Sequence, residues 1–280
     1  MKIGVSSYSF IKYLSDGRMN LKDVIKKARE IGFDAIEFIG FEDENFSLEF
    51  AREIKDEAKN NNIEISAYVT GANLLKEGDE LSEEIKTIKK HIDIAETLGT
   101  KLFRYDVAGQ LPRFVSFEMA LEKVVDSMRE IADYAKEKGI MTMIENHGRA
   151  FQDAYRMEKV YNRVNHENFS LLVDIGNFAC VDEDSVKSVS RLANLASHVH
   201  VKDFIIKPFE IGQKEDDCFV TRGGNRLYGT TPGDGDIKSV QCIEILKKAG
   251  YDGYIDIEYE GSQDCIVALE KALKYIKTVC

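Results

Sequence analysis

The stretch FEMALEKVVDSMREIADYAKEKGIMTMIE, residues 117–145, decides the fold class because it contains one helix, one helix end and one strand in succession. Apolar residues at three- and four-residue spacing over Phe117–Lys138 predict an amphipathic helix. Gly139 follows at the place where a left-handed residue ends a helix. Met141–Glu145 then predicts a short strand, apolar enough for a parallel sheet that helices cover.

The same order of elements recurs along the chain. Eight strand-like runs rich in Ile, Val, Phe and Tyr are each followed by an amphipathic helical stretch, about every 35 residues. The expected strands are Ile3–Ser9, Ala35–Ile39, Ile63–Val69, Lys101–Tyr105, Met141–Glu145, Ser170–Asp174, His198–Val201 and Tyr254–Glu258. The expected helices are Leu21–Ile31, Leu48–Asn60, Glu83–Leu98, Phe117–Lys138, Glu158–Val164, Ser185–Leu195, Ile237–Ala249 and Asp264–Val279.

The continuity of this pattern favours a closed architecture. No Pro- or Ser-rich linker divides residues 1–280, so we expect a single α/β domain that forms a (β/α)8 TIM barrel. The alternative, an open doubly wound sheet, needs a Gly-rich phosphate turn, and none follows the first strand.

Composition excludes several classes of protein. The chain has 38 Lys and Arg against 49 Asp and Glu, a formal net charge of −11 at pH 7, which opposes binding to nucleic acid. The sequence has no apolar run of membrane-spanning length and its start turns polar too early for a signal peptide, so we expect a cytoplasmic protein without a membrane partner. The five cysteines are scattered, which argues against a disulfide framework or a thiolate zinc site.

The C-terminal ends of the last four strands carry the residues expected to do chemistry. Glu145, Asp174, His200 and Glu258 offer three carboxylates and one imidazole, which could converge on one divalent metal ion. Manganese, magnesium or cobalt suits this set best, with zinc possible. Each of these residues alone could instead cap a loop or lie at the surface.

Other polar residues lie near the same strand ends. His147 could contact substrate or hydrogen-bond backbone, and Arg104 could bind substrate hydroxyls or pair with Asp106. Glu37 ends the second strand in a similar position. His198 shares a face with His200 one layer deeper, which favours a core or supporting role.

Two further histidines and a long connection complete the set. His91 and His166 are expected to be solvated. A loop at about 204–236 follows the seventh strand, and it could cover the site and present Arg222 or Arg226 to an anionic or polyhydroxylated substrate. The alternative is a flexible loop whose arginines are solvated.

Five motifs in this order resemble the xylose-isomerase-like barrel superfamily, and its sugar phosphate isomerase/epimerase branch in particular. They are IENH (144–147), VDIGN (173–177), HVHVKD (198–203), GDGDI (233–237) and IEYEG (257–261).

The resemblance implies one divalent metal held by Glu145, Asp174, His200 and Glu258. It also implies that Glu145 and Glu258 act as catalytic acid and base on opposite sides of a bound sugar. We expect Lys202 in the strand-seven motif to contact substrate with His147, Arg104, Arg222 and Arg226.

Asn177 departs from the family pattern. Epimerases of this family usually carry a histidine there that helps to bind substrate. Asn177 can still hydrogen-bond substrate, but it cannot transfer a proton near neutral pH.

The expected function is a divalent-metal-dependent isomerase or epimerase. It would act on a small sugar or sugar-like ketone by proton abstraction and a metal-stabilised enediolate. The alternatives are a metal-dependent lyase or dehydratase on a keto-sugar or keto-inositol, and a non-catalytic sugar-binding barrel. The expected partner is a small carbohydrate, with a homo-oligomer possible. An abasic-site endonuclease would need a cluster of several metals with more histidines than the five present.

Overall fold

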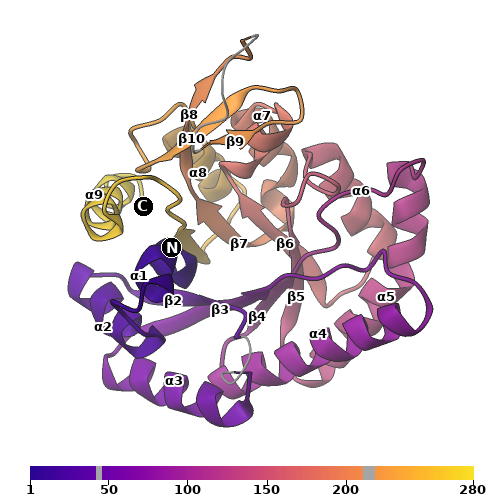
Figure 1. Ribbon diagram of the computed structural model, residues 1–280, viewed down its shortest axis with the longest axis horizontal. Coiled ribbons are helices and arrows are strands. Elements are labelled where there is room, and N and C mark those ends of the chain that lie inside the picture. The colour runs from indigo at the N-terminus through magenta and orange to yellow at the C-terminus, as the bar shows by residue number, and fades with distance from the viewer. Residues whose placement is uncertain (42–45, 211–217) are drawn as a thin grey trace.

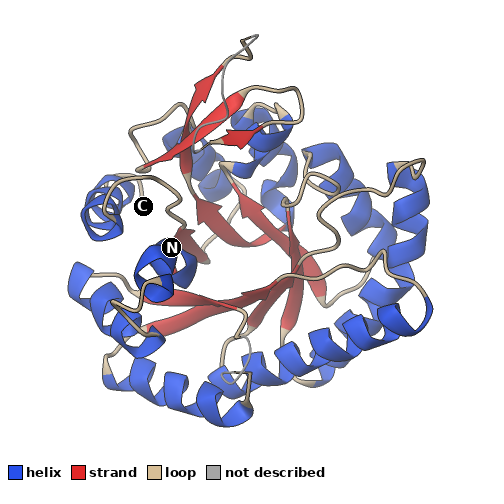
Figure 2. Ribbon diagram, viewed as in Figure 1, coloured by secondary structure: helices blue, strands red, loops and turns tan. Residues whose placement is uncertain are grey.

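Eight parallel strands close into a barrel surrounded by helices (Figures 1 and 2). The computed structural model describes residues 1–41, 46–210 and 218–280. The barrel strands, in the order in which they pair, are β1 (Lys2–Ser6), β11 (Tyr254–Ile257), β7 (Ala196–Val201), β6 (Phe169–Asp174), β5 (Met141–Glu145), β4 (Leu102–Tyr105), β3 (Glu64–Thr70) and β2 (Ala35–Ile39). The predicted (β/α)8 TIM barrel is therefore confirmed.

The helices that connect the strands form the outer layer, as Figure 2 shows. They are α2 (Leu21–Ile31), α3 (Leu48–Asn60), α4 (Gly78–Leu98), α5 (Phe117–Glu137), α6 (Ala154–Val164), α7 (Ser185–Leu192), α8 (Ser239–Lys248) and α9 (Cys265–Lys277). Shorter segments are η1 (Ser7–Phe10), α1 (Ile11–Ser15), η3 (Asn177–Val181) and η4 (Ala193–Leu195).

Several predicted boundaries are wrong: helix α6, for example, begins at Ala154 and not at the predicted Glu158. Two of the differences have clear local reasons. The first strand ends at Ser6, because the Ser6 side chain accepts a hydrogen bond from the Tyr8 amide and the chain turns into η1. Helix α4 begins at Gly78, before the predicted start at Glu83. The early start brings Asp79 and Glu80 into the first turn, where acidic side chains stabilise the helix dipole.

The predicted long loop after the seventh strand is also wrong in part. The described residues there form an antiparallel sheet of β8 (Asp203–Lys207), β10 (Arg226–Thr230) and β9 (Phe219–Val220), beside α7 and α8 in Figure 1. The runs Phe204-Ile205-Ile206 and Arg226-Leu227-Tyr228 have the β-branched and aromatic composition of strands. A repeating pattern of one strand and one helix per unit has no place for an extra hairpin, so the repeat alone predicts a loop over these runs. Residues 211–217 of the predicted loop lie outside the described ranges.

Alternate residues of the barrel strands face the helices and the barrel interior. On β7, Val199 and Val201 belong to the large core between strands and helices. His198 and His200 face inward on the same strand and are buried. The interior is therefore polar on this side, and its polar residues continue upward to the C-terminal ends of the strands.

Across the described ranges, every helix is too short or too polar to cross a lipid bilayer.

Candidate metal centre

Four of the predicted site residues converge at the C-terminal ends of β5, β6, β7 and β11. Glu145, Asp174, His200 and Glu258 each offer one ligand atom, and these atoms all lie within 4.8 Å of one another. His200 Nδ1 is 3.7 Å from Glu145 Oε1 and 3.9 Å from both Asp174 Oδ2 and Glu258 Oε2. The imidazole nitrogen therefore faces all three carboxylates.

Unsatisfied atoms in this group fit a cation. Asp174 Oδ2 and His200 Nδ1 are buried and have no hydrogen-bond partner among the described residues, although Asp174 Oδ2 forms an ion pair with the Lys202 ammonium at 3.2 Å. The other oxygen of Asp174 is occupied, because the amides of Gly176 and Asn177 donate to Oδ1 at 2.7 and 3.0 Å. Buried atoms with free lone pairs are costly unless a proton or a metal ion satisfies them.

The pKa values of Asp174 and His200 also indicate a site that favours a cation. Burial raises the pKa of Asp174 to about 7, and Glu145 and Glu258 add to the rise, while Lys202 opposes it. Burial opposes protonation of His200, yet Glu37 and Glu145 raise its pKa well above the ordinary value. The site therefore favours an extra positive charge, which a divalent ion would supply while displacing the Nδ1 proton.

Glu145 is fixed by donors on both oxygens. Arg104 Nη2 lies 2.5 Å from Oε2, and Asn177 Nδ2 donates to Oε1 at 2.9 Å. Burial would raise the pKa of Glu145, but Arg104 and His200 hold it well below its ordinary value. Glu145 is therefore a firmly ionised carboxylate.

Arg104 is itself held on three sides, by Glu145, by Asp106 at 2.7 Å and by the Thr70 carbonyl at 3.2 Å. The ion pair with Asp106, one of its two predicted roles, is thus present. His147 Nδ1 is 3.0 Å from Asp106 Oδ1, and its side chain is 49% exposed at the rim. Contact of His147 with substrate stays a prediction.

Lys202 lies on the opposite side of the group. Its ammonium is 3.2 Å from Asp174 Oδ2, pairs with Glu258 Oε2 and is 3.5 Å from Glu260 Oε2. The contacts of Glu258 with Lys202 and His200 both use Oε2. Its side chain is 13% exposed, more than that of Glu145 at 5%.

The two predicted loop arginines are engaged by protein groups. Arg222 donates to the Arg149 carbonyl at 2.6 Å and pairs with Asp153 at 3.2 Å, which ties the small sheet to the segment after β5. Arg226 is buried on β10, with Nη1 3.6 Å from Cys218 Sγ. Direct contact of either arginine with substrate stays a prediction.

The GDGDI motif has a structural part that the sequence did not reveal. The Asp203 carboxylate accepts hydrogen bonds from the amides of Gly233, Gly235 and Ile237 at 2.9 to 3.0 Å. A Cβ on Gly235 would lie 2.2 Å from Asp203 Oδ1, so only glycine fits there. The motif thus fastens the end of the connection to β8.

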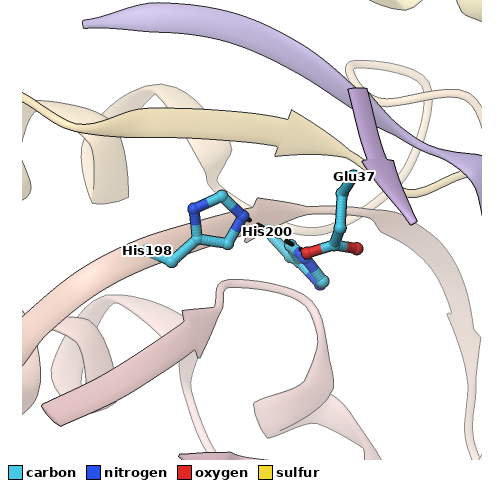
Figure 3. A group of neighbouring side chains, drawn as sticks. All are labelled: Glu37, His198 and His200. Carbon is cyan, nitrogen blue, oxygen red and sulfur yellow. Dashed lines mark hydrogen bonds and ion pairs between the residues drawn. The ribbon is translucent and has the colours of Figure 1, made fainter. Parts of the chain in front are cut away.

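Two expectations about side-chain surroundings need revision. His91 was expected to be solvated, but it is 7% exposed because α4 turns it against β3, where its Nδ1 lies 3.1 Å from the Tyr68 hydroxyl. Glu37, expected in a position similar to that of Arg104 and Asp106, is instead fully buried, with its Oε2 2.8 Å from His200 Nε2 (Figure 3). The sequence does contain a signal for this burial, because Glu37 is the charged residue in a strand otherwise made of Ala, Ile and Phe.

Comparison with known proteins identifies the family. Residues 25–279 match the model of the xylose isomerase-like TIM barrel. The chain belongs to this family. The resemblance drawn from the five motifs is therefore confirmed.

Similar proteins carry several activities on this fold. An inosose dehydratase from Mesomycoplasma hyopneumoniae strain J is 28% identical over 242 residues, which cover 80% of this chain and 78% of that protein. A D-allulose 3-epimerase from Methylomonas sp. superposes with a TM-score of 0.78 at 18% identity, covering 100% of this chain and 98% of the other. The IOLI protein with a bound zinc atom gives 0.78 at 19% identity, with the same coverage. At these identities the two structures show a shared fold.

Proposed function

We propose that this protein is a metal-dependent dehydratase that removes water from a small polyhydroxy ketone of the inosose type. The observation that carries the proposal is the convergence of Glu145, Asp174, His200 and Glu258 within 4.8 Å at the C-terminal end of the barrel. The similarity to inosose dehydratases over most of the chain supports this class of substrate. The dehydratase alternative of the sequence analysis thereby takes precedence over the isomerase.

The four residues would hold one divalent ion through three oxygens and His200 Nδ1. Such an ion would supply Lewis-acid polarisation of a substrate carbonyl. Three oxygens and one nitrogen suit manganese, magnesium, cobalt or zinc.

Glu258 is the proposed base. It is more exposed than Glu145, and its contacts with Lys202 and His200 leave Oε1 available to a ligand. Glu145 has both oxygens engaged by Arg104 and Asn177 and a lowered pKa, so it is a weak base. Both glutamates were expected to transfer protons, and the contacts favour Glu258.

The elimination balances without a second acid. Glu258 takes the proton from the carbon next to the carbonyl. The C–H electron pair forms a double bond to the following carbon, away from the carbonyl, as the C–O bond on that carbon breaks. The departing hydroxide takes the proton back from Glu258 and leaves as water. Lys202 and Arg104, on either side of the carboxylates, would stabilise the negative charge that develops on the substrate.

A 3-epimerase is the second candidate, because it shares the ligand set and the first proton abstraction. Two glutamates at one site support it. Asn177 weakens it, since its amide cannot replace the substrate-binding histidine as a proton carrier.

One experiment separates the candidates. Purified protein loaded with Mn²⁺ or Co²⁺ is incubated in heavy water with an inosose or with D-allulose, and products are followed by NMR and mass spectrometry. Loss of one water from the inosose, abolished in Glu258→Gln and retained in Glu183→Gln, would support the dehydratase. Deuterium incorporation with inversion and no loss of water would support the epimerase. Binding of metal and sugar without either change would support the non-catalytic barrel.

A further inference from the structure

Below the candidate metal centre, the barrel interior contains a chain of buried carboxylates and imidazoles. We name Asp256, His198, Glu37 and His200 the polar chain, after the order in which they contact one another. His198 Nε2 is 3.0 Å from Asp256 Oδ2 and 3.3 Å from Glu37 Oε2, and His200 Nε2 is 2.8 Å from that same Glu37 oxygen. Figure 3 shows Glu37, His198 and His200 turned toward one another, with dashed lines marking their contacts.

The polar chain is shielded from water and comes from three separate strands. All four side chains are at most 1% exposed. Glu37 lies on β2, Asp256 on β11 and the histidines on β7. Buried charges of this kind are kept only where hydrogen bonds hold each of them in one geometry.

Further residues keep the far end of the polar chain in place. Ser66 Oγ donates to Asp256 Oδ2 at 2.5 Å. Gly4 on the neighbouring β1 leaves the space that Asp256 occupies, since a Cβ there would lie 2.0 Å from its Oδ1. Asp256, at the end of the polar chain farthest from His200, is therefore held in position by a hydrogen bond from Ser66 and by the close fit against Gly4.

The contact between Glu37 and His200 fixes which nitrogen is free. A carboxylate can only accept, so the 2.8 Å contact places a proton on His200 Nε2. The lone pair of a neutral imidazole then lies on Nδ1, the atom that faces Glu145, Asp174 and Glu258. An imidazole whose other nitrogen donates to a carboxylate is also a stronger metal ligand.

We propose that Glu37 is a positioning residue that orients His200 to bind the metal through Nδ1, with His198 and Asp256 holding Glu37 in place. The inference rests on the proposed function only in requiring that the four-residue group binds a metal. A second ion held by Glu37, His198 and His200 is the competing arrangement. It is disfavoured because both Nε2 atoms lie at hydrogen-bond distance from a single oxygen.

Metal affinity tests the proposal without any assay of turnover. Metal-free wild type, Glu37→Gln, Glu37→Leu, His200→Ala and Glu183→Gln are titrated with Zn²⁺ against a competing chelator. Gln at position 37 can donate as well as accept, so it no longer enforces the tautomer, and Leu removes the acceptor. We expect affinity about 10- to 100-fold lower in both Glu37 variants, a larger loss in His200→Ala and none in Glu183→Gln. Glu183 is a matched control because it accepts bonds from Ala154 and Ser188, away from the polar chain.

The imidazole tautomer provides a second readout on the wild type, which remains decisive if a Glu37 variant fails to fold. In protein labelled with ¹⁵N at histidine, Zn²⁺ should shift His200 Nδ1 and leave a proton on Nε2. Coordination through Nε2, or two ions per chain, would overturn the inference. So would a folded Glu37→Gln that keeps both wild-type affinity and the Nε2–H tautomer. A wild type that binds no metal at all would instead refute the proposed function.

Discussion

The two sides of the barrel interior are built on different principles. Inward-facing residues of β3, β5 and β6 form a small apolar cluster, separate from the core beneath the helices: Ala67, Val69, Met143 and Leu172. On the other side, β2, β7 and β11 contribute the polar chain of Glu37, His198, His200 and Asp256. Packing alone specifies the apolar cluster, whereas directional bonds specify the polar chain. This barrel therefore gives up apolar burial on the side where carboxylates hold the two imidazoles.

The largest expected effect is on chemistry at the upper end of the polar side. Glu258→Gln should lower turnover by about 10³-fold, because the amide cannot accept the substrate proton, while the melting temperature stays near that of wild type. Steady-state kinetics on an inosose with calorimetry measures both. If Glu258→Gln retains turnover, another residue is the base.

A substitution in the apolar cluster should lower stability and leave metal binding nearly unchanged. Met143 is fully buried, so Met143→Ala should lower the free energy of unfolding by about 3 kcal/mol through lost burial and a cavity. Zn²⁺ affinity of the folded protein should stay within about twofold of wild type, since Met143 belongs to the cluster and not to the polar chain. Denaturant titration and metal titration measure the two quantities. A large fall in affinity would show that the two sides of the interior are coupled.

His91 is an imidazole whose pKa is determined mainly by burial. Burial lowers its pKa to about 4 from the ordinary 6.5. A group with a lowered folded-state pKa contributes stability above its unfolded pKa and loses it as pH falls, here from 6.5 toward 4. His91→Gln should therefore flatten the pH dependence of the free energy of unfolding in this window, by up to about 3 kcal/mol. Identical pH profiles for variant and wild type would contradict the assignment.

A smaller effect should follow from crowding the far end of the polar chain. Gly4→Ala brings a Cβ against Asp256, which should cost about 2 kcal/mol of stability and weaken Zn²⁺ binding. Gly109→Ala is the matched control, because a Cβ there meets no described atom within 4 Å. Denaturant titration gives the free energy of unfolding of both variants, and metal titration gives their Zn²⁺ affinity. If the two variants agree in both quantities, Asp256 does not help to hold Glu37 in place.

The smallest effect is expected at Arg222, outside the barrel. Its side chain is 40% exposed and bound to Asp153 and the Arg149 carbonyl, so Arg222→Ala should lower the melting temperature by only about 2 °C. KM should stay within about twofold of wild type if the arginine serves only to hold the small sheet. A tenfold rise in KM would restore the substrate contact predicted from the sequence.

Much of the fold could be predicted because it follows from local periodicity. The bounds of β2, β5, α2 and α3 match the prediction residue for residue, since alternation and helical spacing mark them strongly. The convergence of Glu145, Asp174, His200 and Glu258 was predictable for a related reason. A closed parallel barrel brings the ends of its strands together, whichever residues they carry.

Other features depend on contacts between distant residues. The hydrogen bond between His200 and Glu37 joins residues 163 positions apart and follows from barrel closure, which leaves only β1 and β11 between β2 and β7 around the interior. The small sheet was missed because hairpin pairing of β8 with β10 spans a connection that the repeating pattern does not include. The burial of His91 depends on the rotation of α4 against Tyr68, which its own sequence does not specify.

The metal centre is best tested by the metal content and metal affinity of purified wild type beside His200→Ala. Both proteins are analysed for bound metal, stripped, and titrated with Mn²⁺, Co²⁺ and Zn²⁺. We expect about one tightly bound divalent ion per wild-type chain and its loss in the variant, because His200 Nδ1 faces all three carboxylates. Absence of binding by wild type, or equal binding by both proteins, would contradict the proposed metal centre.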